Sequence, residues 1–104
     1  MKLFTVLTTE FALEDLKLAQ TFYEAQAPQL GDYFFDALLT DIESLHLYAG
    51  IHPKKFGYHK MLSKRFPYAI YYSLDEDETI VKVIAVLDQR QHPVSHYTHL
   101  SYRD

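Results

Sequence analysis

The sequence contains no cysteine, only three glycines and four prolines, and no apolar run of membrane-spanning length. Without cysteine, neither a disulfide framework nor a thiolate metal site can form. A membrane helix needs about 18 or more consecutive apolar residues, and three scattered glycines cannot supply the loops that hold phosphate groups or dinucleotides. The start, MKLFTVLTTEF, lacks the apolar core and cleavage site of a signal peptide. We therefore expect a cytoplasmic protein without a cofactor.

What remains is the composition of a folded globular protein. The chain has 104 residues, of which 48% are hydrophobic, 15% aromatic and 23% charged. This length is sufficient for one hydrophobic core and too short for two. We expect a single domain over residues 1–104.

The first half of the sequence predicts one strand and two helices. Residues Leu3 to Leu7 are short, apolar and β-rich, and the threonines that follow favour a helix N-cap. Two stripes at helical spacing come next, separated at Pro28. The first stripe, in a helix reaching about Gln26, contains Ala12, Leu16, Ala19 and Tyr23; the second, stopped at Gly50, contains Leu30, Phe34, Leu38, Ile42, Leu45 and Ala49. The two helices are expected to form an antiparallel hairpin.

The second half changes to the period of two that is typical of strands. Three strands are predicted, over Phe56 to Leu62, Phe66 to Ser73 and Thr79 to Asp88. The last contains TIVKVIAVLD, whose nearly continuous apolar character indicates a central strand covered on both faces. The predicted fold is α+β, with the order β-α-α-β-β-β and helices on one side of an antiparallel-rich sheet.

Alternation along the second of these strands separates its aromatic residues between two faces. Tyr68 and Tyr72 share a face with Phe66 and Ile70, which we expect to point into the core. Ala69 and Tyr71 face the opposite side. Tyr72 is therefore predicted to be a core residue rather than a site residue.

Charge is distributed unevenly over an acidic chain. The net charge is −4, yet residues 51–72 contain five basic residues and no acid. These are Lys54, Lys55, Lys60, Lys64 and Arg65. A basic band with tyrosines between its charges can meet phosphates by charge and bases by stacking. The alternative is that alternating strands place lysines on their wet face and aromatics on their core face.

Three histidines recur near the C-terminus at helical spacing. His92, His96 and His99 lie at i, i+4 and i+7, on one face of a helix that begins at Pro93. Such a stripe can bind zinc, but no carboxylate at matching spacing completes a site. We assign no metal, and the alternative is a solvated or partner-facing helix.

The sequence as a whole resembles the RelE/ParE superfamily of bacterial toxins, the stable halves of type II toxin-antitoxin or plasmid-stabilisation pairs. ALEDLKLAQTFYEAQAPQLGDYF is similar to the first helix and helix turn of that family, RFPYAIYY to its third strand, and IAVLDQRQHP to its last strand and exit. The resemblance implies a helical hairpin packed on a twisted, antiparallel-rich sheet, in agreement with the order predicted from periodicity. It also implies a cognate antitoxin whose C-terminal segment wraps the helices and sheet in a toxin-antitoxin hetero-oligomer. A homodimer is a further alternative, since an unpaired edge strand and the aromatic-rich sheet could pair between copies.

The superfamily has two branches with different targets. RelE-like members cut messenger RNA at the ribosome, whereas ParE-like members poison DNA gyrase and need no active site. If the chain is RelE-like, the resemblance implies that the catalytic residues are among Lys60, Arg65, Arg90, His96 and Tyr97. The residues proposed to bind target or antitoxin are Lys54, Lys55, Lys64, Arg65 and Arg90.

The resemblance favours the ParE-like or an unassigned plasmid-stabilisation branch, because RFPYAIYY and the ending LDQRQHP are more similar to these than to the RelE-like ribonucleases. Other features count against catalysis. The chain is acidic overall, DQRQ contains one arginine where many relatives carry two, and Asp88 would place a negative charge beside a phosphate. Two alternatives stay open: a RelE-like ribosome-dependent messenger endoribonuclease, and a degenerate, non-enzymatic binding module. Arg90 either faces the target or forms an ion pair with Asp88 or with an acid on the second helix.

Overall fold

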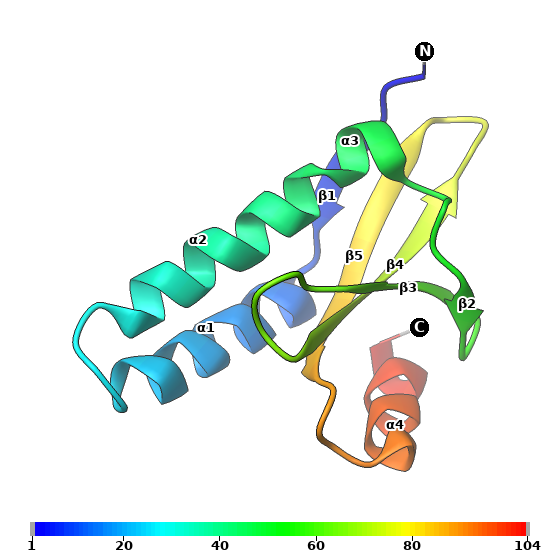
Figure 1. Ribbon diagram of the computed structural model, residues 1–104. Coiled ribbons are helices and arrows are strands. Elements are labelled where there is room, and N and C mark those ends of the chain that lie inside the picture. The colour runs from blue at the N-terminus through cyan, green and yellow to red at the C-terminus, as the bar shows by residue number, and fades with distance from the viewer. Residues whose placement is uncertain (1, 104) are drawn as a thin grey trace.

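The computed structural model describes residues 2–103, in which five strands and four helices are found (Figure 1). In chain order they are β1 (Thr5–Thr8), α1 (Glu10–Glu24), α2 (Leu30–Glu43), α3 (Leu45–Tyr48), β2 (Lys54–Lys55), β3 (Tyr58–Leu62), β4 (Tyr68–Asp75), β5 (Ile80–Asp88) and α4 (Pro93–Arg103). The β-α-α-β-β-β order is confirmed, with a short strand β2 and a C-terminal helix in addition. None of the described helices has the length and apolar character needed to cross a membrane.

The strands form one mixed sheet in the order β1-β5-β4-β3-β2. β5 lies between β1 and β4, which confirms the prediction of a central strand. It pairs parallel with β1 and antiparallel with β4, and the other pairs are antiparallel. The parallel pair exists because α1, α2 and α3 return the chain across the sheet between β1 and the hairpins.

The helical hairpin of α1 and α2 covers one face of the sheet (Figure 1). Thr9 begins α1 as predicted, because its hydroxyl accepts a hydrogen bond from the amide of Ala12. The four predicted positions of α1 are buried, as are most of the second stripe. Gly31 allows the two helices to approach closely: a Cβ atom there would lie 2.6 Å from the carbonyl oxygen of Gln20.

The two faces of the sheet hold separate cores. Tyr68, Ile70 and Tyr72 belong to the core beneath α1 and α2, whereas Ala69 and Tyr71 belong to the core beneath α4. The predicted division of β4 is therefore confirmed, and Tyr72 is fully buried.

The strand predicted over Phe56 to Leu62 is wrong at its start. Phe56 and Gly57 form the turn between β2 and β3, with φ angles of 57° and 85°. Two successive residues with positive φ match the tight turn of a two-residue hairpin. Lys54 and Lys55, which lay outside the predicted strand, form β2 instead.

Element ends also differ from the predicted ones. α1 ends at Glu24 rather than Gln26. The second predicted helix is interrupted at Ser44, whose hydroxyl donates to the carbonyl oxygen of Asp41, so α3 is a separate turn of helix. β4 begins at Tyr68 rather than Phe66.

Candidate target- and partner-binding surfaces

His96 joins α4 to the sheet. Its Nε2 atom lies 2.7 Å from the carbonyl oxygen of Asp88, and its Nδ1 atom lies 2.8 Å from the hydroxyl of Tyr71. Since a carbonyl only accepts, Nε2 carries the proton and Nδ1 accepts from the tyrosine. Burial lowers the pKa of His96, which favours this neutral form. The residue is 3% exposed and both ring nitrogens are occupied, so it is not placed to transfer a proton to a bound substrate.

The other two histidines of the C-terminal stripe do not join His96. His92 precedes α4, and its Nδ1 atom accepts a hydrogen bond from the amide of Val94. His99 is exposed on α4. Within residues 2–103, no group of three or more His, Cys, Asp or Glu side chains is placed to hold a metal ion.

Lys60 and Tyr97 lie on the same side of the sheet as His96. The ammonium of Lys60 is 5.9 Å from the centroid of the Tyr71 ring, and burial together with Lys55 lowers the pKa of Lys60. The ring of Tyr97 packs edge-on against Phe56 at the β2–β3 turn, with 5.7 Å between centroids. Three of the five candidate catalytic residues therefore gather around β3 and α4.

Arg65 lies elsewhere, in the β3–β4 turn beside α2. Its Nη1 atom donates to the hydroxyl of Tyr33, 3.1 Å away. Asp41 of α2 supports the same turn, accepting hydrogen bonds from the hydroxyl of Ser63 and the amide of Lys64. Asp41 is buried and was missed from the sequence, where it is one acid among many on the second helix.

Arg90 follows β5 and is exposed. Its Nε and Nη2 atoms donate to the carboxylate of Asp88 at 2.9 and 2.7 Å, and its own amide adds a third hydrogen bond to that carboxylate. These bonds hold the pKa of Asp88 below its ordinary value. Of the alternatives for Arg90, the structure shows the ion pair with Asp88. The arginine therefore presents a charge that its neighbour already compensates.

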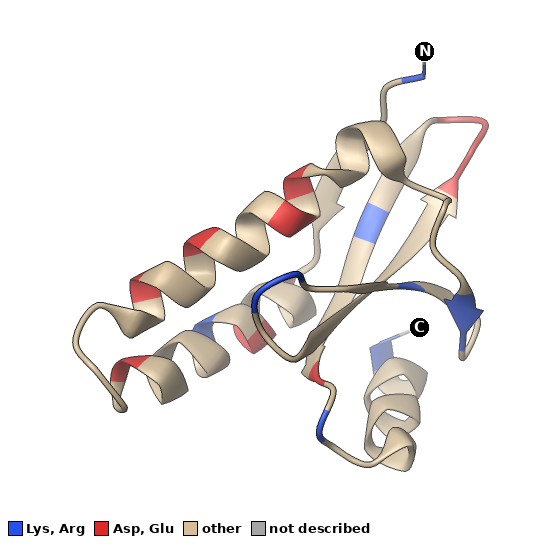
Figure 2. Cartoon of the chain, viewed as in Figure 1, with Lys and Arg blue, Asp and Glu red and all other residues tan. Residues whose placement is uncertain are grey.

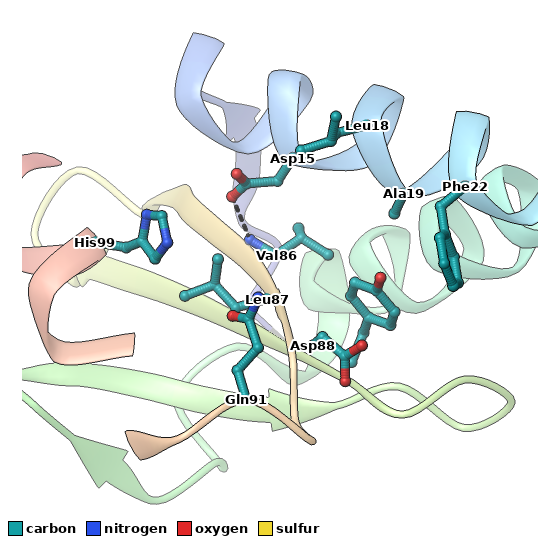
Figure 3. A pocket seen from close by; sticks show the side chains of 10 residues that line it. Asp15, Leu18, Ala19, Phe22, Val86, Leu87, Asp88, Gln91 and His99 are labelled. Atoms are coloured by element: carbon teal, nitrogen blue, oxygen red, sulfur yellow. Dashed lines mark hydrogen bonds between the residues drawn. The ribbon is translucent and has the colours of Figure 1, made fainter. Parts of the chain in front are cut away.

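A groove of about 270 Å³ runs along the outer edge of β5, between α1 and α4 (Figure 3). It exists because β1 pairs with β5 only through Ile80–Val83, which leaves the rest of the β5 edge without a neighbouring strand. Leu18 and Phe22 of α1 form an apolar wall, 76% and 51% exposed, and His99 lies on the opposite side.

An ion pair joins α1 to α4 beside this groove. The guanidinium of Arg103 donates to both carboxylate oxygens of Asp15, and it also reaches the carbonyl oxygen of Ile84. Asp15 in turn accepts a hydrogen bond of 2.9 Å from the amide of Val86 (Figure 3). These side chains satisfy backbone groups of the β5 edge. Sequence reasoning missed both charged residues because 88 positions separate them.

Charged residues are unevenly distributed over the elements. Figure 2 shows acids along α2 and at the β4–β5 turn, and basic residues in β2 and in the β3–β4 turn, which lies beside α2. A small α+β protein with an apolar groove and a separate basic surface is suited to binding other macromolecules.

Comparison with known proteins agrees with this description. The family profile described as the ParE toxin of the type II toxin-antitoxin system, parDE, matches residues 6–93. The chain belongs to this family and is a type II toxin. A chain of the solved structure of the chromosomal ParDE TA system from P. aeruginosa has the same fold, with a TM-score of 0.71 and 13% identity. The alignment covers 81% of this chain and 94% of that one. No curated protein sequence matches.

Proposed function

We propose that this toxin arrests growth by binding DNA gyrase and that it does not cut messenger RNA. The observation that carries the proposal is the state of His96, which is buried and has both ring nitrogens bonded inside the protein. Gyrase acts on the chromosome, so the proposal places the toxin in the cytoplasm.

The arrangement of the remaining candidate residues supports the same proposal. Cutting RNA through its 2′-hydroxyl requires a proton acceptor, a proton donor and positive charge around one phosphate. Arg65 is bonded to Tyr33 beside α2, away from the side of the sheet on which Lys60 and Tyr97 lie. Arg90 is compensated by Asp88. The positive charges of Lys60, Arg65 and Arg90 therefore do not lie together around one position that a phosphate could occupy.

Gyrase binding requires a contact surface instead of a reaction centre. We assign the target contacts to the basic residues of the β2–β3 hairpin and the β3–β4 turn, and to Arg90 at the exit of β5. The residues are Lys54, Lys55, Lys64, Arg65 and Arg90, all of which are exposed. The exposed charges of the hairpin and the turn steer association and set the partner's orientation. Arg90, whose charge is compensated by Asp88, contributes contact area instead.

The cognate antitoxin is assigned to the groove along β5. An antitoxin segment can place apolar side chains against Leu18 and Phe22, while Asp15 and Arg103 keep the backbone groups of Ile84 and Val86 satisfied. The toxin and antitoxin would form a hetero-oligomer in which this wall of α1 is buried.

The test uses two reactions with the same protein preparation. DNA supercoiling by purified gyrase and cleavage of a defined messenger on ribosomes are measured with wild type and with Arg90→Ala. We expect wild type to inhibit supercoiling and to leave the messenger intact. Cleavage of ribosome-bound messenger by wild type, with supercoiling unaffected, would refute the proposal.

A further inference from the structure

Two histidines next to the β2–β3 hairpin, His52 and His59, are held in place by hydrogen bonds to their Nδ1 atoms. Neither belongs to the surfaces described above. His52, between α3 and β2, has its Nδ1 atom 2.7 Å from the hydroxyl of Tyr72. His59 of β3 has its Nδ1 atom 2.7 Å from the carbonyl oxygen of His52. The ring of His59 stacks on the ring of Tyr72, with centroids 5.0 Å apart and 17° between the planes.

The hydrogen bonds determine how each ring presents its second nitrogen. The Tyr72 hydroxyl accepts from the amide of Gly50 at 2.8 Å and can donate its own proton to Nδ1 of His52. His52 then carries its proton on Nε2. His59 must donate from Nδ1 to a carbonyl, so its Nε2 atom has a free lone pair when the ring is neutral.

Both Nε2 atoms are accessible from solvent. No intramolecular hydrogen bond to either is found among the described residues, whose buried polar side-chain atoms are all satisfied. Of the described Asp and Glu side chains, none forms an ion pair with either histidine. The two partly exposed rings therefore each have an Nε2 atom that is in contact with solvent and has no carboxylate bound to it.

Lys54 places a positive charge beside the pair. It lies directly opposite His59 in the β2–β3 ladder. The next pair of opposing residues, Pro53 and Lys60, is a hydrogen-bonded pair, because the amide of Lys60 donates to the carbonyl oxygen of Pro53 at 2.8 Å. In an antiparallel ladder, hydrogen-bonded and non-hydrogen-bonded pairs alternate. Lys54 and His59 thus form a pair of the closer kind, whose Cβ atoms lie about 4.5–5.5 Å apart on one face.

We propose that His52, His59 and Lys54 form a binding site for a phosphate group. His52 donates from Nε2, and Lys54 contributes an ammonium with three donors. His59, whose Nε2 atom carries a lone pair, accepts from the O–H group of a hydrogen phosphate. Tyr72 is a positioning residue, because its hydroxyl orients His52 and its ring supports His59.

The two rings of the site interact electrostatically, because burial and then His59 lower the pKa of His52. The groups that face the site are Lys54 from β2, the ring and hydroxyl of Tyr72 from β4, and the two histidines themselves.

The experiment follows the imidazole signals of the intact toxin by NMR during titration with inorganic phosphate. We expect the signals of His52 and His59 to shift together as phosphate is added. Absence of these shifts at tens of millimolar phosphate would overturn the proposal.

Variants locate the site. Lys54→Gln removes an exposed charge without altering the core and should weaken phosphate binding at least severalfold, and His59→Gln should abolish the linked shift of His52. His46→Gln is the matched control, because Nδ1 of His46 also bonds a backbone carbonyl, but the residue lies in α3 and not in the β2–β3 ladder. Equal binding by wild type and Lys54→Gln, or loss of binding in His46→Gln, would contradict the assignment.

The source of the phosphate is distinguished with short oligonucleotides. Inorganic phosphate and a 5′-phosphorylated oligonucleotide should both bind if the site takes a terminal or free phosphate, and an unphosphorylated oligonucleotide should bind as well if it takes the nucleic-acid backbone. Oligonucleotide binding that is unchanged in Lys54→Gln and His59→Gln would show that nucleic acid contacts another surface, and would refute this site as its receptor.

Discussion

Replacing His96 with leucine is expected to destabilise the toxin and to weaken the dependence of its stability on pH. Leucine occupies a similar volume but cannot donate to the carbonyl oxygen of Asp88 or accept from the hydroxyl of Tyr71. Because His96 joins α4 to β4 and β5, the substitution tests whether this helix is an integral part of the fold.

The expected loss in the free energy of unfolding follows from the two hydrogen bonds of His96. The bond to Asp88 is partly buried, so water can replace it at a net cost of about 0.5–1.5 kcal/mol. The Tyr71 hydroxyl is fully buried and would lose its partner, which costs about 1–3 kcal/mol. The sum, about 1.5–4.5 kcal/mol, is a large fraction of the roughly 5–15 kcal/mol that stabilises a domain.

The pH dependence has a definite sign. Burial lowers the pKa of His96 in the folded protein, so the unfolded chain binds a proton more readily. Stability that is present at neutral pH is therefore lost as pH falls below about 6.5, the ordinary value for histidine. His52 contributes in the same direction, because burial and His59 lower its pKa as well.

Urea unfolding measured between neutral and mildly acidic pH tests both parts of this prediction. His96→Leu should lower the midpoint at neutral pH and reduce, without abolishing, the loss of stability on acidification. His99→Leu, on an exposed position of the same helix, is the control and should change little. A midpoint and pH profile for His96→Leu that match wild type would refute the assigned role of the two bonds.

Four further substitutions test the packing and the proposed surfaces. Gly31→Ala should destabilise by about 1–3 kcal/mol in urea unfolding, because its Cβ atom would meet the backbone of α1. Arg103→Ala should cost about 2–3 kcal/mol, since it leaves the largely buried Asp15 carboxylate without its partner; proteolysis should then begin in α4. Leu18→Glu should weaken antitoxin binding in calorimetry by tenfold or more while the unfolding midpoint stays unchanged. Arg90→Ala should raise the toxin concentration that inhibits supercoiling, without changing stability; an unchanged concentration would remove Arg90 from the gyrase contact.

The local hydrophobic pattern of the sequence was sufficient to predict each helix or strand that buries one of its sides. The helical stripes of α1 and α2 and the alternating faces of β4 follow directly from which residues must avoid water, and this requirement repeats with the period of the element itself. The central place of β5 was predictable for the same reason: both of its faces are covered, so its sequence is apolar nearly throughout.

Tertiary structure alone decided which polar groups meet. Asp15 reaches Arg103 because α1 and α4 lie on either side of the β5 edge, and no local pattern connects positions so far apart in the chain. His96 looked like one member of a solvated stripe, yet it is buried because α4 covers the second core beneath Tyr71. Burial then converts a possible proton-transfer group into a structural one, since its hydrogen bonds must be satisfied within the protein.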